Sequence, residues 1–210
     1  MKDIANTPLV SIICSTYNHG LYISQCLDGF LMQKTNFPFE ILIHDDASTD
    51  NTPDIIREYE HNQPQVIRPI YQKENKYSKK EDIFAKYQCS RVRGKYIAIC
   101  EGDDYWIDPL KLQKQIDFLE NNPDYGMIYT TSKVYNQKEG KIEEDIIGRE
   151  FNGYIELLSG NCIPTLTTCI RSSLVMEYLK EVEPKSKNWL MGDYPMWLWI
   201  CLLYTSPSPR

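Results

Sequence analysis

Short apolar runs alternate with amphipathic stretches along the first half of the chain. Residues 10–14, 39–43 and 96–100 form three mostly apolar runs, and each ends abruptly in polar residues. Runs of this length are typical of strands that are buried on both faces of a sheet. Strands that alternate with helices predict an α/β fold, with a mostly parallel sheet flanked by helices on both faces.

The stretches between these runs carry helical signals. Thr52 is a suitable N-cap and Pro53 a suitable first helical residue, so a helix is expected to begin there. Pro69 limits residues 66–72 to an edge strand. Apolar residues at helical spacing predict three further helices. The second of these is expected to end near Gly94. The residue sets are Ile23, Leu27, Phe30 and Leu31 for the first helix, Ile83, Phe84 and Tyr87 for the second, and Leu112, Ile116 and Leu119 for the third.

The pattern changes in the second half of the chain. Residues 126–136 predict one more strand, and the polar segment 136–153 predicts a hairpin or a mobile loop. Residues 165–175 indicate a strand that leads into a helix. The apolar run that begins at Met196 is too short to span a membrane and predicts a core helix, with contact to a membrane surface as the alternative. We expect one domain over residues 1–200 and a disordered or foreign tail over residues 201–210.

Composition excludes several classes of protein. A net charge of −6 and a pI near 5.2 argue against a nucleic-acid-binding surface, which needs a basic face. The N-terminus lacks the apolar core of a signal peptide. The seven cysteines form no C-x-x-C pair, which indicates free thiols in a reducing cytoplasm rather than disulfides or a zinc site.

Polar clusters follow the three clearest strands. In open parallel sheets, ligands bind beyond the carboxyl ends of the strands, so these clusters are expected to share one rim. Carboxylates suit Mg²⁺, Mn²⁺ or Ca²⁺, and Mg²⁺ is commonly held by one or two carboxylates together with substrate phosphates. The residues are Tyr17 and Asn18 after the first strand, Asp45 and Asp46 after the second, and Glu101, Asp103 and Asp104 after the third.

Each cluster also has a simpler interpretation. The segment "DDASTD" is compatible with a helix-capping turn, and "EGDD" with a solvated turn. A calcium loop is rejected because Asn51 replaces the required glycine and Arg57 the required glutamate. His19 and His44 are interpreted as rim or core histidines rather than metal ligands, because no second histidine stands at ligand spacing.

The order of four motifs resembles glycosyltransferase family 2, with the GT-A fold. These are "STYN" and "DDASTD", each after a strand, then "GKYIAICEGDDYW", and "MGDYPMW" later in the chain. The resemblance extends from about residue 9 to residue 199 and implies transfer of a sugar, with inversion, from a nucleotide-sugar to an acceptor hydroxyl.

The resemblance also implies roles for individual residues. Tyr17 and Asn18 match the lining of the nucleotide pocket, and Asp46 matches the acid that contacts the base, with Asp45 beside it. Asp103 and Asp104 match the D-x-D region, which contacts the ribose and the metal that holds the diphosphate. Glu101 is the first acid of that region. Asp193 matches the catalytic base, and the implied cofactor and donor are Mg²⁺ or Mn²⁺ and a UDP- or dTDP-sugar.

Some features depart from the family pattern or leave its details open. Ser15 stands where proline is common and Gly192 where glutamate is common, and the absence of Q-x-x-R-W implies a non-processive enzyme. Asp193 is also compatible with an N-cap. Thr165, Thr167 and Thr168 either face an acceptor or fill a strand.

The partners are implied only in outline. The acceptor is expected to be a glycan, a lipid-linked sugar or a cell-surface polysaccharide of a bacterium. A cytoplasmic location is implied, with association at the inner face of the membrane left open. The C-terminus is interpreted as truncated or chimeric. Two alternatives remain: a non-catalytic module that binds nucleotide-sugars, and a sugar nucleotidyltransferase, which the missing glycine-rich phosphate loop disfavours.

Overall fold

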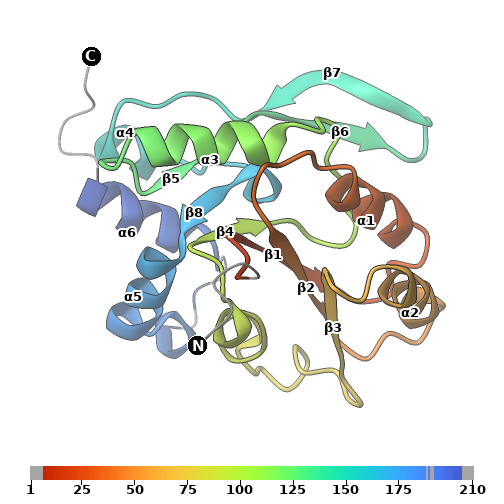
Figure 1. The fold of residues 1–210 in the computed structure, drawn as a ribbon. Helices are drawn as coiled ribbons and strands as arrows, with labels where there is room; N and C mark the ends of the chain where they lie inside the picture. The colour runs from red at the N-terminus through yellow and green to blue at the C-terminus, as the bar shows by residue number, and fades with distance from the viewer. Residues whose placement is uncertain (1–6, 188, 190–191, 205–210) are drawn as a thin grey trace.

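A six-stranded sheet forms the centre of the molecule (Figure 1). The computed structural model describes residues 7–187, 189 and 192–204. The four strands β3, β2, β1 and β4 are parallel, and β8 runs antiparallel to its neighbours β4 and β5. The α/β prediction with a mostly parallel sheet is confirmed. In spatial order the strands are β3 (Ile67–Tyr71), β2 (Phe39–Asp45), β1 (Val10–Thr16), β4 (Tyr96–Ile99), β8 (Cys169–Arg171) and β5 (Met127–Ile128).

Three helices cover one face of the sheet. They are α1 (Ile23–Leu31), α2 (Thr52–Asn62) and α3 (Lys111–Asn121). The apolar spacing predicts the first and third, and the capping signals predict the second, which begins at Thr52 with Asn51 rather than Thr52 as N-cap. Val10, Ile12 and Cys14 of β1 point to this face and are fully buried in the cluster that these helices complete. Alternate side chains of a strand point to opposite faces, so Ile13 lies in the cluster on the other side.

The second face is covered by shorter and later elements. Ile13 of β1 and Ile97 and Ile99 of β4 pack there against segments from the second half of the chain. The covering elements are η2, a π-helical turn (Phe84–Gln88), η3 (Cys89–Arg91), α4 (Tyr154–Leu158), α5 (Ser172–Val182) and α6 (Tyr194–Tyr204). Two further 3₁₀ turns are η4 (Thr165–Thr167) and η5 (Pro184–Lys187).

Two predicted elements differ in the structure. The helix expected before Gly94 is replaced by η2 and η3, because three apolar residues in one turn do not distinguish an α-helix from tighter or wider turns. The strand expected over 126–136 is divided. After β5 the chain leaves the sheet, and β6 (Ser132–Asn136) pairs with β7 (Lys141–Ile147) in a separate hairpin. The hairpin alternative for the polar segment is therefore correct.

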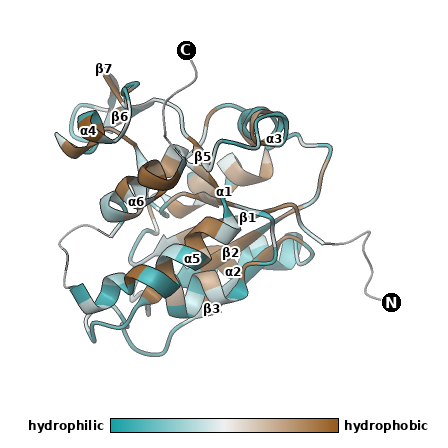
Figure 2. Ribbon diagram, turned by 90° about the vertical axis from the view of Figure 1, so that its left-hand side faces the viewer, coloured by the Kyte–Doolittle hydropathy of each residue, from teal (hydrophilic) through white to brown (hydrophobic). Residues whose placement is uncertain are grey.

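Helix α6 is hydrophobic along most of its length (Figure 2). Met196, Trp197 and Ile200 are buried, which confirms a core helix, whereas Leu202 and Leu203 near its end are exposed. Within the part of the chain that the structure describes, no helix is both long and apolar enough to cross a membrane. Because α6 extends to Tyr204, the expected tail is helical at its start, and residues 205–210 lie outside the described residues.

A buried carboxylate joins strands near the amino end of the sheet. The side chain of Glu40 in β2 is 2% exposed, and it accepts a hydrogen bond of 2.7 Å from the Ser11 hydroxyl of β1. The Arg93 guanidinium donates to the same carboxylate through Nε at 2.9 Å and Nη2 at 2.5 Å. A buried charge is tolerated only when it is paired and fully hydrogen-bonded, and Glu40 meets both conditions.

We predict that Glu40→Ala lowers the free energy of unfolding by about 3 kcal/mol, because Ser11 and Arg93 lose a buried partner. Urea denaturation measures this change. Glu58→Ala, at an exposed position of α2, is the matched control and is expected to change stability by less than about 0.5 kcal/mol. Equal effects of the two substitutions would show that the buried network contributes nothing.

Candidate functional site

The order of the strands brings the three predicted polar clusters to one edge. β1 lies between β2 and β4, and its parallel register pairs Thr16 with Asp45 and Ile13 with Ile99. Beyond the strands, the Asp46 N–H donates to the Thr16 carbonyl at 3.0 Å, and the Gly102 N–H donates to the Ser15 carbonyl at 2.9 Å. The loops that follow β1, β2 and β4 therefore begin side by side.

The loops after β1 and β2 are joined by Asn18. Its backbone N–H donates to Ser48 Oγ at 2.8 Å, and its side-chain oxygen accepts the Thr49 N–H at 2.8 Å. Asn18 and Ala47 have φ values of 55° and 63°, a region that residues other than glycine rarely occupy. Much of "DDASTD" thus works as a turn, and it is held against "STYN", whose Tyr17 remains 44% exposed.

Asp45 and Asp46 are both buried, and the protein itself occupies their oxygens. Asp45 accepts the Ser48 hydroxyl at 2.5 Å, and burial raises the pKa of this carboxyl group. Asp46 accepts the backbone N–H groups of Lys76 at 2.7 Å and Tyr77 at 2.9 Å. Asp46 therefore holds the segment after β3 at the rim. This contact could not be predicted from the sequence, because every residue except proline has a backbone N–H and the donors therefore do not depend on residue type.

Three carboxylates gather in the loop after β4. Glu101, Asp103 and Asp104 each offer an oxygen, and these oxygens lie within 4.8 Å of one another. Burial first, and then the charge of Asp103, raises the pKa of Asp104 to about 6. Burial is also the largest cause that raises the pKa of Glu101, and the charges of Asp103, Asp104 and Asp193 add to it. The residue as a whole is nevertheless exposed to solvent.

This donor set fits a hard divalent cation, since it consists of carboxylate oxygens at close range. A cation would also offset the burial of these charges and the repulsion between them, which together raise both pKa values. The backbone is shaped for a close approach, because a Cβ atom on Gly102 would lie 2.8 Å from Thr16 Oγ1. That hydroxyl is buried and has no hydrogen-bond partner.

Trp106 anchors the acidic loop to the core. Its indole N–H donates to the Leu166 carbonyl at 2.7 Å, and its ring packs edge-on against Phe30 of α1 at 4.8 Å between centroids. Gly29 allows this contact, since a Cβ there would lie 2.9 Å from the Trp106 backbone. Beneath the ring lies the Lys111 ammonium, 4.1 Å from the centroid, and burial lowers the pKa of this lysine to about 8.

Asp193 reaches the same region from the N-terminal end of α6. One of its oxygens accepts the hydroxyl of Thr165, and the other accepts the Tyr194 N–H at 2.7 Å. Its charge is close enough to contribute to the raised pKa of Glu101. Asp193 also serves the start of the helix, since its carbonyl accepts the N–H groups of Met196 and Trp197. Thr167 and Thr168 are instead buried, and their hydroxyls donate within their own turn; the Thr167 hydroxyl also accepts the Thr130 N–H.

His19 lies at this site, and the sequence predicted for it only a rim or core position rather than a role as a metal ligand. Its Nε2 lies 3.8 Å from Asp103 Oδ2, and its Nδ1 is buried without a hydrogen-bond partner. The ring rests against Gly102, where a Cβ would come within 2.9 Å of Nδ1. Its position directly after "STYN" was the available signal, but the missing second histidine argued against it.

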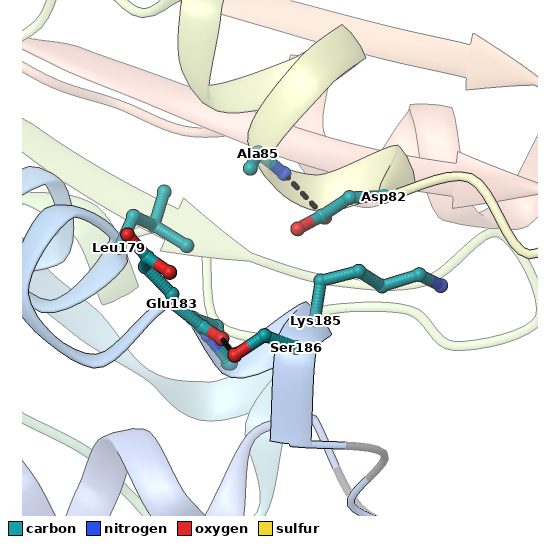
Figure 3. Close-up of a pocket in the computed structure, with 7 residues that line it drawn as sticks. Asp82, Ala85, Leu179, Glu183, Lys185 and Ser186 are labelled. Carbon is teal, nitrogen blue, oxygen red and sulfur yellow. Dashed lines mark hydrogen bonds between the residues drawn. The ribbon is translucent and has the colours of Figure 1, made fainter.

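A separate cavity of about 300 Å³ lies between the start of η2 and the end of α5 (Figure 3). None of the predicted site residues lines it. Its lining residues are Asp82, Ala85, Leu179, Glu183, Pro184, Lys185 and Ser186. This cavity is therefore distinct from the rim at the carboxyl ends of the strands, where the predicted site residues lie.

Comparison with known sequences identifies the family of the chain. The sequence model described as "Glycosyl transferase family 2" matches residues 11–177. The chain belongs to glycosyl transferase family 2. The resemblance stated from its motifs is thereby confirmed, and the match covers all three strand-end clusters.

Two relatives match a little under two thirds of the chain. Rv1520 of Mycobacterium tuberculosis, an uncharacterized protein, is 43% identical over 137 residues, which are 64% of this chain and 38% of that protein. WfaP of Escherichia coli, a UDP-Glc:alpha-D-GlcNAc-diphosphoundecaprenol beta-1,3-glucosyltransferase, is 33% identical over 131 residues, or 62% of this chain and 48% of WfaP. The matched part thus corresponds to less than half of either relative.

A solved structure supports the fold. The mannosyltransferase PcManGT from Pyrobaculum calidifontis, in complex with GDP-Man and Mn²⁺, superposes with a TM-score of 0.65 and 19% identity. The similarity covers 97% of this chain and 55% of the other. The mostly parallel sheet flanked by helices is therefore the GT-A fold of family 2.

We predict that Asp104→Asn stabilises the metal-free protein at pH 8 by on the order of 1–2 kcal/mol, or about 2–6 °C in Tm. Folding raises the pKa of this acid, so its ionisation costs stability as the pH rises from about 4 through about 6. The gain should therefore shrink towards pH 4.5. Thermal unfolding with EDTA measures it, and Asp145→Asn on exposed β7 is the control. A gain that does not depend on pH would contradict the explanation.

Proposed function

We propose that this chain carries the catalytic region of an inverting glycosyltransferase. The substrate is a sugar linked to a nucleoside diphosphate, and the acceptor is a hydroxyl group. The observation that carries the proposal is the group of three carboxylates at the end of β4, with Asp193 near enough for its charge to raise the pKa of Glu101. An acidic rim suits a nucleotide-sugar only if a cation offsets its charge, and the donor set is suited to one.

The donor is expected to lie across the carboxyl ends of β1, β2 and β4. Tyr17 and Asn18 are proposed to line the nucleotide pocket, with Asp45 and Asp46 at its far side. Because the Lys76 and Tyr77 N–H groups already occupy Asp46, a base contact must use its remaining lone pairs. Asp103 is proposed to contact the ribose as well as the metal.

Glu101, Asp103 and Asp104 are the residues proposed to hold Mg²⁺ or Mn²⁺. When bound, the ion would stabilise the negative charge that develops on the leaving diphosphate. The structure of PcManGT contains Mn²⁺ with its donor, which supports a divalent ion in this fold.

Asp193 is proposed as the general base. The acceptor oxygen attacks the anomeric carbon on the face opposite the diphosphate, the new C–O bond forms, and the bond to the diphosphate breaks. The electron pair leaves with the nucleoside diphosphate, and Asp193 takes the acceptor proton. The Thr165 hydroxyl and the Tyr194 N–H hold the carboxylate in one orientation, and each oxygen keeps a further lone pair for the incoming hydroxyl.

The relatives guide the choice of substrates. The name of WfaP gives a UDP-linked donor and a lipid-diphosphate acceptor, and the PcManGT structure holds GDP-Man. We propose a UDP- or dTDP-sugar as donor, with GDP-sugars as the first alternative. The acceptor is proposed to be a glycan or a lipid-linked sugar of polysaccharide biosynthesis. Transfer would be non-processive and would take place on the cytoplasmic side of the membrane.

A thermal-shift experiment tests the donor site. UDP, dTDP and GDP are each added with MnCl₂, with MgCl₂ or with EDTA. Ligand at 100 times its Kd should raise stability by about 2.7 kcal/mol, and the shift should require the metal. No shift with any of the three nucleotides would remove the basis of the proposal. Binding without donor hydrolysis or transfer would instead indicate a non-catalytic binding module.

We predict that Asp193→Asn lowers kcat by at least about a hundredfold, because an amide cannot accept the proton of the acceptor hydroxyl. The nucleotide Kd should change by less than about threefold, since the amide still accepts the Tyr194 N–H. Donor turnover and nucleotide titration separate the two quantities. Asp124→Asn, at an exposed position, is the matched control. A parallel loss of binding and turnover would assign Asp193 to the fold rather than to proton transfer.

A further inference from the structure

His19 lies against the acidic loop in a fixed orientation. Its side chain is 22% exposed, and its ring lies edge-on to Tyr22, with the centroids 6.3 Å apart. On the inner side, Nδ1 is enclosed beside Gly102, where no side chain has room. The ring therefore presents Nε2 to Asp103 of the acidic loop, and this nitrogen is 3.8 Å from Asp103 Oδ2.

An ion bound by both groups would bring these two atoms closer together. Ligand atoms about 2.1 Å from an octahedral ion are about 3.0 Å apart when adjacent. The Asp103 side chain is 49% exposed, so a rotation of its carboxylate can shorten the 3.8 Å separation between Nε2 and Oδ2 to that value. The Thr16 hydroxyl, 3% exposed and without a partner, flanks the same glycine, so two orphaned polar atoms border the proposed metal site.

The chemistry of the donors then determines which ion is favoured. Mg²⁺ binds oxygen ligands and keeps much of its water, whereas an imidazole nitrogen is a better ligand for transition metals. We propose that His19 binds the divalent ion through Nε2 and gives the site a preference for Mn²⁺ over Mg²⁺. This inference rests on the proposed function, because it assigns a ligand to the ion of the same site.

Electron paramagnetic resonance of Mn²⁺ tests the inference without any measurement of activity. The full chain is titrated with MnCl₂, alone and with UDP or GDP, and the loss of the free-ion signal gives the Kd; MgCl₂ competition gives the second Kd. His19→Gln should weaken Mn²⁺ binding about tenfold and Mg²⁺ binding less than about twofold. His61→Gln on exposed α2 is the matched control and should change neither value.

A spectroscopic measurement on the native protein distinguishes a lost ligand from a misfolded variant. Pulsed measurements on the native protein should show a ¹⁴N coupling to bound Mn²⁺ that is absent in His19→Gln. Mn²⁺ bound without nitrogen coupling, or an equal loss of both ions in the variant, would overturn the role of His19 and leave the proposed function intact. No Mn²⁺ binding under any condition would overturn both.

Discussion

The mutual repulsion of three carboxylates in one short loop is the constraint on which the site depends. Like charges at this distance are unstable unless protons or a cation compensate them. Burial first, and then this repulsion, raises the pKa values of Glu101 and Asp104. The loop keeps its place because its first residues continue the pairing of β4 with β1. Trp106 then fixes its far end through the Leu166 carbonyl and the contact with Phe30.

The two ends of the sheet differ in how completely their buried polar groups are hydrogen-bonded. At the amino end, Glu40 is buried with a complete set of partners, which stabilises the association of β1, β2 and the turn before β4. At the carboxyl end, Asn18 and Ala47 adopt left-handed backbone conformations, and Thr16 has an unpaired hydroxyl. Strain and unsatisfied polar atoms of this kind persist where surrounding structure over-determines them, and they gather at functional sites.

The second half of the chain supplies the other wall of the site. β8 enters the sheet antiparallel beside β4, and η4 and the start of α6 follow the same side. This arrangement carries Thr165 and Asp193 towards the acidic loop, with their hydroxyl–carboxylate contact between them. The proposed donor half of the site thus comes from consecutive strand–loop units, and the proposed acceptor half from elements that are distant in sequence.

The sequence by itself determined the buried strands, most helices and the three strand-end clusters, because burial imposes a periodic pattern on neighbouring residues. Its motifs also identified the family. Only the tertiary structure decided that Lys76 and Tyr77 occupy Asp46, that Thr165 orients Asp193, and that His19 faces Asp103. These contacts join residues far apart in the chain, through backbone groups or single side chains. Such pairs leave no periodic trace, so their partners are fixed only when the sheet brings the loops together.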